Sequence, residues 1–264
     1  MTGATREAIA TAHLMDVAVQ GRYGVEYVKY WINEAQGRLF CLCTAPDAES
    51  ANRVHREAHG LVAERIVEVD PDLAEGILGG GTVAATGAAL GPRGTLDSGV
   101  RTLLFTDIVG STELTQRLGD RAALDIVDLH DRLVRDALGR TGGREVKHLG
   151  DGVMAVFVEP DPAIRCASDV QAAVRGSVHR TVEPLRIRVG IATGEPIERN
   201  GDFFGSTVQL AARLCMQATP GQTLVSSSVA ELCGHRQLID VGELTLKGFP
   251  NAVRAHAVVE ETPT

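Results

Sequence analysis

Two aspartates are the residues of this sequence best placed for chemistry. Asp107 ends the apolar run LLFTD shortly before Gly110-Ser111-Thr112, and Asp151 stands in a Gly-Asp-Gly turn between REVKHL and VMAVFV. Where a strand runs into a helix, unpaired amide groups and the positive end of the helix dipole attract phosphate. A carboxylate at that place needs a cation between itself and the phosphate, so the pattern predicts bound magnesium or manganese. Two aspartates that share divalent ions could activate an attacking oxygen and neutralise a polyphosphate leaving group.

Both aspartates also have an ordinary structural explanation. An Asp-Gly pair between two strands is usually only a hairpin turn. Asp107 could cap the helix that follows it, although Ser111 and Thr112 suit that role better. Taken singly, the turn therefore remains a strong explanation of Asp151.

The composition is that of a globular protein, with room for two domains in 264 residues. A net charge of −8 argues against non-specific nucleic-acid binding, which needs a basic face. The five cysteines are odd in number and the N-terminus has no apolar signal core, so we expect a reducing, cytoplasmic location. The longest uncharged stretch, 76–92, is rich in Gly, Ala and Thr, which predicts a linker rather than a membrane span. We expect neither a nucleic-acid nor a membrane partner.

The elements that must position these residues fall into two domains. Residues 1–70 are expected to form a small domain with helices at 4–22 and 48–59, a hairpin around 33–37 and a closing strand in ERIVEV, residues 64–69. The Gly/Ala/Pro-rich stretch 71–98 predicts a flexible linker.

The second domain, residues 99–264, has the pattern of a strand, two helices, a hairpin, a helix, a strand, a helix and two final strands. This order predicts an α+β sandwich. Asp107 then lies at the end of the first strand and Asp151 in the hairpin, where neighbouring strand ends could bring the two carboxylates together.

Five ordered segments of this domain resemble the catalytic domain of class III adenylyl and guanylyl cyclases. They are FTDIVGST, EVKHLGDGVMAVF, RIRVGIATGE, GDFFGSTVQLAARL and GELTLKG, and the similarity covers about residues 99–260. The resemblance implies a ferredoxin-like core, so that the chain would hold two ferredoxin-like α/β sandwich domains, the second with the class III nucleotidyl cyclase fold. It also implies a head-to-tail homodimer whose active sites are shared between protomers and hold two Mg²⁺ or Mn²⁺ ions each.

Within that resemblance, one protomer supplies the metal ligands and the phosphate cradle. By motif position the metal ligands are Asp107, Ile108 and Asp151. The cradle would be the backbone of Ile108, Val109, Gly110, Ser111 and Thr112.

The other protomer would supply the base-reading and phosphate-clamping residues. Lys147 and Asp202 match the pair that reads adenine, Arg213 the residue that stabilises charge at the α-phosphate, and Lys247 the lysine that holds the terminal phosphates. The chemistry agrees, because adenine offers an acceptor at N1 and a donor at its amino group, whereas guanine presents the reverse pattern. Taken singly, Lys147 is explained as a solvated strand residue and Asp202 as a turn former.

Gln209 departs from the family pattern, which usually has an asparagine four residues before the arginine to orient the ribose. Glutamine carries the same donors and acceptor one methylene further out. A displacement of about 1 Å in a positioning group can cost on the order of a hundredfold in rate. We therefore expect a working but slow enzyme.

The N-terminal segments RYGVEYVKYW, LFCLCTAPDAESANRVHREAHG and LVAERIVEV resemble a small ferredoxin-like domain family of bacteria that includes nickel-binding members. Domains of that family usually begin with a strand, whereas Met1 stands almost at the first helix. We expect either a true start upstream of Met1 or a strand supplied by a partner chain.

This domain also carries residues that could bind nickel or another transition metal. Two histidines are spaced i, i+4 on one helix face, near further nitrogen, sulfur and oxygen donors. The candidate ligands are His13, Asp16, Cys41, His55 and His59. The histidines are also explained as the polar face of a surface helix, and Cys41 as a core residue.

Together these patterns predict an adenylate cyclase that converts ATP to 3′,5′-cyclic AMP and pyrophosphate at a shared homodimer site, in cyclic-nucleotide signalling. Two alternatives stay open. One is a nucleotide-binding sensor that has lost turnover through Gln209. The other is a metal-responsive regulator, in which the N-terminal domain binds nickel or copper and changes the cyclase dimer.

Overall fold

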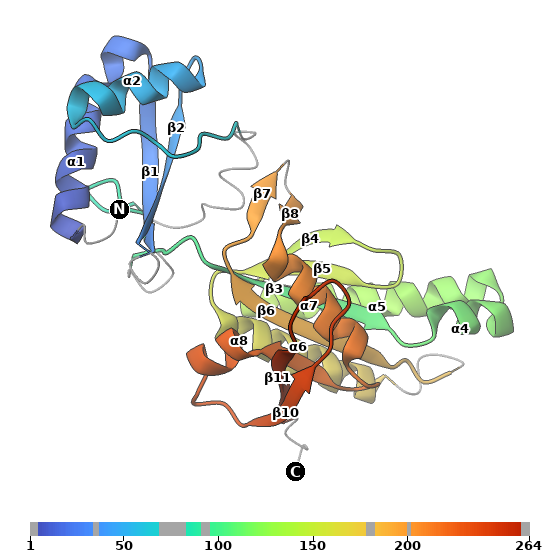
Figure 1. Cartoon of the computed structure of the whole chain (residues 1–264). Helices are drawn as coiled ribbons and strands as arrows, with labels where there is room; N and C mark the ends of the chain where they lie inside the picture. The colour runs from blue at the N-terminus through green and yellow to red at the C-terminus, as the bar shows by residue number, and fades with distance from the viewer. Residues whose placement is uncertain are drawn as a thin grey trace. The chain divides into compact units, whose positions relative to one another are not determined.

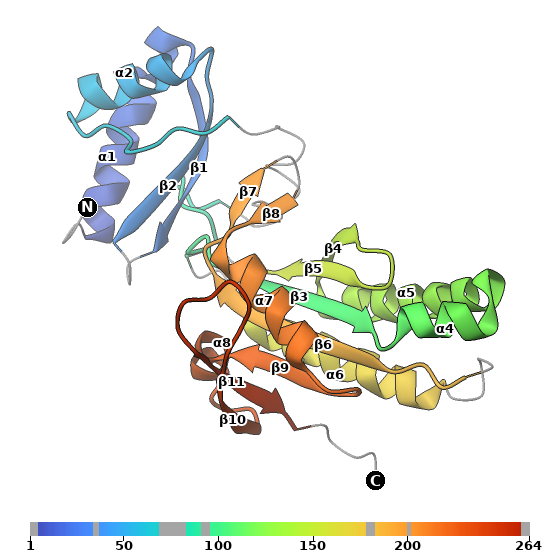
Figure 2. The same ribbon diagram turned by 45° about the vertical axis from the view of Figure 1, so that its right-hand side comes forward.

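The structure is a computed structural model that describes residues 5–33, 37–68, 83–90, 96–177, 183–199 and 202–259. The chain divides into two compact units. The first comprises Met1–Val100 with Arg199–Gly201, and the second Arg101–Glu198 with Asp202–Thr264. Two views of the ribbon are given in Figure 1 and Figure 2.

The first unit packs two helices against an antiparallel hairpin. Its elements are α1 (Arg6–Val19), η1 (Gln20–Tyr23), β1 (Glu26–Asn33), β2 (Arg38–Thr44) and α2 (Ala48–Ala58). Thr5 and Asp47 begin the two α-helices, and their side-chain oxygens accept hydrogen bonds from first-turn amides. The helices and the hairpin therefore form where the sequence predicts them.

The closing strand predicted at 64–69 is not formed over residues 64–68, the part of it that the structure describes. Ile66 and Val67 in this segment are 37% and 47% exposed. The prediction was wrong because a strand needs a hydrogen-bonding neighbour, which the β-branched residues of the segment itself do not reveal.

Part of the stretch predicted as a linker lies against β1. Tyr30 donates its backbone N–H to the carbonyl of Gly87 at 2.9 Å and accepts at its own carbonyl from the amide of Ala89 at 2.6 Å. Ala88, between them, is 2% exposed, and the indole of Trp31 donates to Asp97 at 3.1 Å. Residues 83–90 thus pack within the first unit, while 71–82 and 91–95 lie outside the described residues.

The second unit is built on a seven-stranded sheet with the order β10-β11-β9-β6-β3-β5-β4. Only β6 and β9 pair in parallel among these neighbours. The first elements are β3 (Arg101–Ile108), α4 (Ser111–Leu118), α5 (Asp120–Thr141), β4 (Arg144–His148), β5 (Val153–Phe157), α6 (Pro160–Gly176) and β6 (Ile187–Gly194). The remaining elements are β7 (Ile197–Arg199), β8 (Asp202–Phe204), α7 (Ser206–Gln217), β9 (Thr223–Ser226), α8 (Ser227–Leu232), β10 (Leu238–Leu244) and β11 (Val253–Val258). The α+β class is confirmed, and the central order β6-β3-β5-β4 is that of a ferredoxin-like core.

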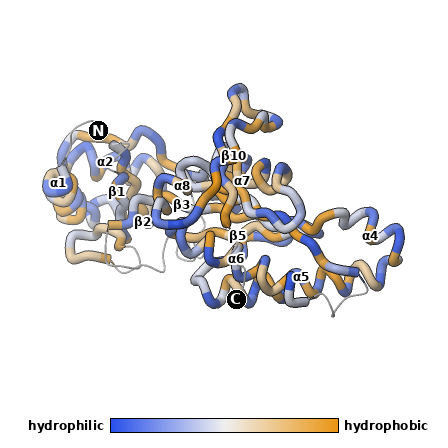
Figure 3. The backbone as a smooth tube through the Cα atoms, turned by 90° about the horizontal axis from the view of Figure 1, so that it is seen from below, coloured by the Kyte–Doolittle hydropathy of each residue, from blue (hydrophilic) through white to orange (hydrophobic). Residues whose placement is uncertain are grey.

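Helices cover both faces of this sheet. α5 and α6 lie on one face and α7 on the other (Figure 1, Figure 2). In Figure 3 hydrophobic residues dominate the central strands, whereas α5 alternates between hydrophobic and hydrophilic residues. Gly190 on β6 lets α7 approach, because a Cβ there would collide with the backbone of Ala211 and Cys215. Within the described residues, no helix combines the length and the apolar character that a membrane span requires.

Candidate active site

The fold brings Asp107 and Asp151 to the same end of the sheet. β3 and β5 are antiparallel neighbours, and beyond their pairing the amide of Ile108 donates to the carbonyl of Asp151 at 2.9 Å. Gly152 is required for this approach, because a Cβ at that position would collide with the carbonyl oxygen of Thr106. These contacts hold the backbones of β3 and of the turn before β5 together, so both aspartates lie at the same end of the sheet.

Each of the two carboxylates has a protein partner. Arg188 donates from Nε to Oδ2 of Asp107 at 2.6 Å, and the hydroxyl of Ser111 donates to Oδ2 of Asp151. Neither aspartate caps α4, since the residue before that helix is Gly110, with φ 69° and no side-chain cap bond. Carboxylate oxygens at adjoining strand ends are the ligand type that magnesium and manganese prefer, so these residues fit a divalent-ion site.

Two amides of the expected phosphate cradle already donate hydrogen bonds to carbonyls of the protein. The amides of Ile108 and Val109 donate at 2.9 Å to the carbonyls of Asp151 and Arg186. The first amides of α4, before that of Leu114, have no carbonyl partner within the helix, as at any helix start. The predicted phosphate contacts would therefore be made by the first turn of α4 rather than by the amides of Ile108 and Val109.

A cavity of about 600 Å³ opens beside this turn. Its polar wall includes Ser111, Thr112 and Asp151, and its apolar wall includes Leu114 and Leu149. The cavity thus places hydroxyl and carboxylate oxygens at the edge of an apolar surface.

Lys147 and Asp202 meet although 55 residues separate them in the chain. The ammonium of Lys147, on β4, forms an ion pair with Oδ2 of Asp202, on β8. The other oxygen of Asp202 accepts from the amide of Phe203 at 2.8 Å. The paired side chains are 40% and 27% exposed, so a ligand can reach them from solvent.

Arg213 and Lys247 also lie together. Arg213, on α7, donates from Nε to the carbonyl of Lys247 at 3.0 Å and from Nη1 to the sulfur of Met216 at 3.2 Å. Lys247 itself is exposed, in the loop after β10. Gln209 is exposed on α7 one turn before Arg213. The three predicted phosphate- and ribose-facing residues therefore share one region of the second unit.

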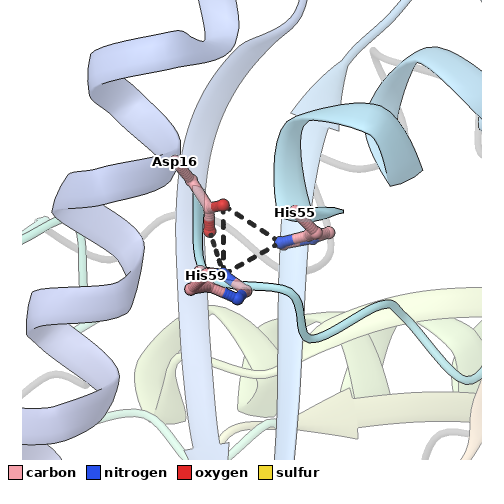
Figure 4. Close-up of side chains that lie close together, drawn as sticks. All are labelled: Asp16, His55 and His59. Atoms are coloured by element: carbon pink, nitrogen blue, oxygen red, sulfur yellow. Dashed lines mark hydrogen bonds and ion pairs between the residues drawn. The ribbon is translucent and has the colours of Figure 1, made fainter. Parts of the chain in front are cut away.

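In the first unit, Asp16, His55 and His59 form a compact cluster (Figure 4). Asp16, on α1, is 2% exposed. Its Oδ1 lies 3.1 Å from Nδ1 of His55 and 3.1 Å from Nε2 of His59, and those two nitrogens are 3.3 Å apart. The ligand atoms all lie within 4.8 Å of one another, which suits one transition-metal ion with nitrogen and oxygen ligands.

The other two predicted ligands lie beside this cluster rather than in it. His13 packs against the rings of Tyr27 and Tyr30, and burial lowers its pKa. Burial raises the pKa of the Cys41 thiol to about 12, which disfavours the thiolate that a metal needs. Cys41 stands opposite Tyr30 in the β1–β2 pairing.

The hydrogen bonds of the two imidazoles limit how a metal could enter. Nδ1 of His59 accepts from the amide of Leu61 at 3.2 Å, so neutral His59 carries its proton on Nε2, the atom that faces Asp16. Nε2 of His55 lies 3.2 Å from the hydroxyl of Tyr27, which can donate or accept. A metal that binds Nε2 of His59 would thus require the proton to leave that atom, and its move to Nδ1 would break the hydrogen bond from Leu61. His55 can free Nδ1 by a change of tautomer, because the Tyr27 hydroxyl can then accept from Nε2.

Residues 98–260 match the family model described as the adenylate and guanylate cyclase catalytic domain. The chain belongs to this family. Residues 1–69 match the model of the family described as nickel responsive protein SCO4226-like. Both resemblances inferred from the motifs are therefore confirmed.

The cyclase domain is similar to curated proteins and to a solved cyclase structure. An uncharacterized protein of Mycobacterium tuberculosis (strain H37Rv) is 38% identical over 151 residues, 57% of this chain and 39% of that protein. The adenylate cyclase of Streptomyces coelicolor is 37% identical over 127 residues, 48% of this chain and 32% of that protein. The crystal structure of an adenylate/guanylate cyclase/hydrolase from Silicibacter pomeroyi is 30% identical, with a TM-score of 0.56 over 61% of this chain and 97% of that one. The chain thus spans about two fifths or less of these two curated relatives.

Sequence reasoning missed Arg188 in this cyclase domain and Tyr27 in the first unit. Arg188 has no local signal in the sequence, because it stands opposite Asp107 only through the pairing of β3 with β6. For Tyr27 the sequence holds no signal, because its contact with His55 joins β1 to a helix 28 residues later.

Proposed function

We propose that the chain is an adenylate cyclase that converts ATP to 3′,5′-cyclic AMP and pyrophosphate. The ribose 3′ oxygen would bond to the α-phosphorus while the bond from that phosphorus to the pyrophosphate oxygen breaks and the hydroxyl proton leaves to water. The observation that carries this proposal is the ion pair of Lys147 with Asp202 on the same unit as Asp107 and Asp151. An ammonium donor beside a carboxylate acceptor complements N1 and the amino group of adenine.

The side chains divide the work by their charge. Asp107 and Asp151 would hold two divalent ions, which when bound favour loss of the hydroxyl proton and neutralise the pyrophosphate. Arg213 would stabilise negative charge that grows on the α-phosphate, a role in which a pre-positioned cation is most effective. Lys247 would hold the terminal phosphates, and Gln209 would orient the ribose.

The base preference gives a direct test. The full chain with Mn²⁺ should form cyclic AMP from ATP and much less cyclic GMP from GTP, both measured side by side. Equal turnover of the two nucleotides would contradict the role of Lys147 and Asp202, and no turnover of either would contradict the proposed reaction.

We further propose that each active site is shared between two chains, as in the family. Asp107→Ala and Arg213→Ala chains should each be inactive alone. Mixed in equal amounts, they should recover about a quarter of the unmodified activity, because half of the dimers are mixed and each of these has one intact site. No recovery on mixing would contradict the shared site.

The Asp16, His55 and His59 cluster supports a second function, a response of the cyclase to a transition metal. Imidazole nitrogens and a carboxylate oxygen suit nickel, copper or zinc. Titration of the full chain with Ni²⁺ should change cyclic AMP output, and Asp16→Asn should abolish the change. Asp47→Asn is the matched control, because Asp47 caps α2 outside the cluster. A flat response in the unmodified chain would remove this function.

A further inference from the structure

A network of hydrogen-bonded side chains lies in the second unit next to the end of β3. His130, on α5, is fully buried, and its Nε2 lies 3.0 Å from the hydroxyl oxygen of Thr106 on β3. Its Nδ1 lies 3.1 Å from Oδ1 of Asp131. Asp131 also lies 3.1 Å from Nε2 of His148, at the end of β4. These side chains join three elements that carry or adjoin the candidate active site.

The donors and acceptors of this network follow from the chemistry of each group. A carboxylate only accepts, so His130 donates from Nδ1 to Asp131. Neutral His130 then accepts at Nε2 from the Thr106 hydroxyl. The oxygen of that hydroxyl accepts in turn from the amide of Val153 at 3.0 Å. One tautomer of His130 therefore satisfies every group from Val153 to Asp131.

Asp131 is the negatively charged member of this hydrogen-bond network. Burial acts to raise its pKa, but the hydrogen bond that His130 donates and the positive charge of Arg135 hold the pKa below its ordinary value. Nδ1 of His148 accepts from the amide of Gly150 at 3.2 Å, which leaves the Nε2 proton for Asp131. An ionised Asp131 thus fixes the orientation of both imidazoles.

The Thr106 hydroxyl links β3, which carries Asp107, to the start of β5, which follows the turn that carries Asp151. Thr106 directly precedes Asp107, and Val153 follows Asp151 by two residues. Close by, the amide of Ile108 donates to the carbonyl of Asp151. The spacing of β3 from the start of β5 therefore depends on where that hydroxyl points.

We propose that Thr106, His130 and Asp131 are positioning residues that hold Asp107 and Asp151 at the spacing needed to share divalent ions. The inference rests on the proposed function, in which those two aspartates bind metal. A buried carboxylate and imidazole cost free energy that apolar side chains of the same volume would not. A connected set of hydrogen bonds, however, fixes direction as well as distance. Removal of groups that hydrogen-bond directly to metal ligands typically weakens metal binding roughly 10- to 100-fold. Thr106 acts through the backbone of β3 instead, so we expect an effect at the lower end of that range.

Thr106→Val and Thr106→Ser separate this role from packing. Valine keeps the shape of threonine but leaves Nε2 of His130 and the amide of Val153 unpaired, whereas serine keeps the hydroxyl. Water-proton relaxation would follow Mn²⁺ binding to the full chain with and without 3′-deoxy-ATP, which lacks the attacking hydroxyl. The part of the Mn²⁺ binding that depends on the nucleotide does not include ions that the first unit binds. We expect its dissociation constant to rise about tenfold in Thr106→Val and to stay within about twofold in Thr106→Ser.

A role in packing alone would lower the thermal midpoint of Thr106→Val and leave Mn²⁺ binding by the folded chain unchanged, and that result would overturn the proposal. If Thr106→Val does not fold, Asp131→Asn decides, because this side chain is 12% exposed and asparagine keeps its volume. Unchanged Mn²⁺ binding in Asp131→Asn would overturn the proposal equally. If Asp107→Ala keeps nucleotide-dependent Mn²⁺ binding, the metal assignment itself is wrong and the positioning role falls with it.

Discussion

Arg188 Nε lies 2.6 Å from Oδ2 of Asp107, directly across the pairing of β6 with β3. The same guanidinium donates from Nη1 to the carbonyl of Met216, near the end of α7, at 3.1 Å. Arg188 therefore orients the carboxylate at the end of the strand and ties it to the helix that carries Arg213.

Arg188→Lys should lower cyclase turnover about tenfold or more at a fixed Mn²⁺ concentration. This is the size of effect expected when a hydrogen-bond partner of a metal ligand is changed. Lysine keeps the charge but is a compact donor that cannot hold both of Arg188's partners in one geometry. Arg186→Lys is the matched control, because Arg186 is exposed and only its backbone carbonyl holds the loop at Val109. Equal turnover in all three chains would show that Arg188 has no part in the site.

Features that depend on local pattern could be predicted from the sequence. β3 is buried along nearly its whole length and its apolar run is continuous, so the strand and the place of Asp107 at its end follow directly. The pairs of the candidate site, such as Lys147 with Asp202, came from ordered motifs whose spacing the family shares. The structure brings that pair together, as those motifs imply.

Features that depend on pairing between distant segments could not be predicted. The segment 64–68 contains β-branched Ile66 and Val67, which favour a strand, yet it is not one, because its own residues do not specify a strand to pair with. Arg188 faces Asp107 only in one register, and a slip of one residue would turn it to the other face. Residues 83–90 have the composition of a linker, but small side chains also permit the close backbone approach to β1 that the structure has.

Exchange of the base-reading pair should exchange the base preference. With Lys147→Glu and Asp202→Lys together, the acceptor and the donor are reversed, which complements guanine rather than adenine. We expect kcat/KM for ATP to fall at least about a hundredfold and the ratio of GTP to ATP turnover to rise, because a mismatched polar site rejects its ligand strongly. The same exchange in Arg140 and Asp169, an exposed ion pair of the same unit, should leave both values unchanged. An unaltered nucleotide ratio in the first double variant would contradict adenine reading by this pair.

Gln209→Asn should raise turnover. The shorter side chain returns the carboxamide to the position usual in the family, and a shift of about 1 Å in a positioning group can be worth on the order of a hundredfold in rate. The measurement is kcat with Mn²⁺ and saturating ATP. Gln217→Asn, at the end of the same helix, controls for the substitution itself. Unchanged or lower turnover in Gln209→Asn would show that glutamine is not the cause of slow catalysis.

Gly152→Ala should destabilise the second unit and abolish cyclase activity. The added Cβ would collide with the carbonyl of Thr106, so the hairpin must move away from β3 and the two aspartates must separate. We expect a loss of about 1–3 kcal/mol in unfolding free energy, typical of overpacked sites. Gly139→Ala is the control, because Gly139 is exposed within α5 with nothing within 4 Å of an added Cβ. That variant should gain roughly 0.5–1 kcal/mol and keep its activity; equal behaviour of the two variants would contradict the close approach.

The stability of the first unit should fall as the pH drops below about 6.5, the ordinary pKa of histidine. Burial lowers the pKa of His13 in the folded chain, while Asp16 acts to raise it and His55 to lower it. Between pH 6.5 and the lower folded value, the unfolded chain binds a proton at this residue that the folded chain does not. Because stability rises with pH wherever the unfolded state binds more protons, acid must destabilise the unit over this range.

Trp31, the single tryptophan of the chain, lies in the first unit and reports its unfolding by fluorescence. Denaturant midpoints measured with a chelator present should fall from pH 7.5 to 5.5 in the unmodified chain and fall less in His13→Leu. Leucine also removes a ring nitrogen, Nδ1, that has no hydrogen-bond partner within the described part of the chain. His235→Leu, at an exposed position of the second unit, should leave the pH dependence of the Trp31 signal as it is. Parallel pH curves for the unmodified chain and His13→Leu would show that another group causes the acid sensitivity.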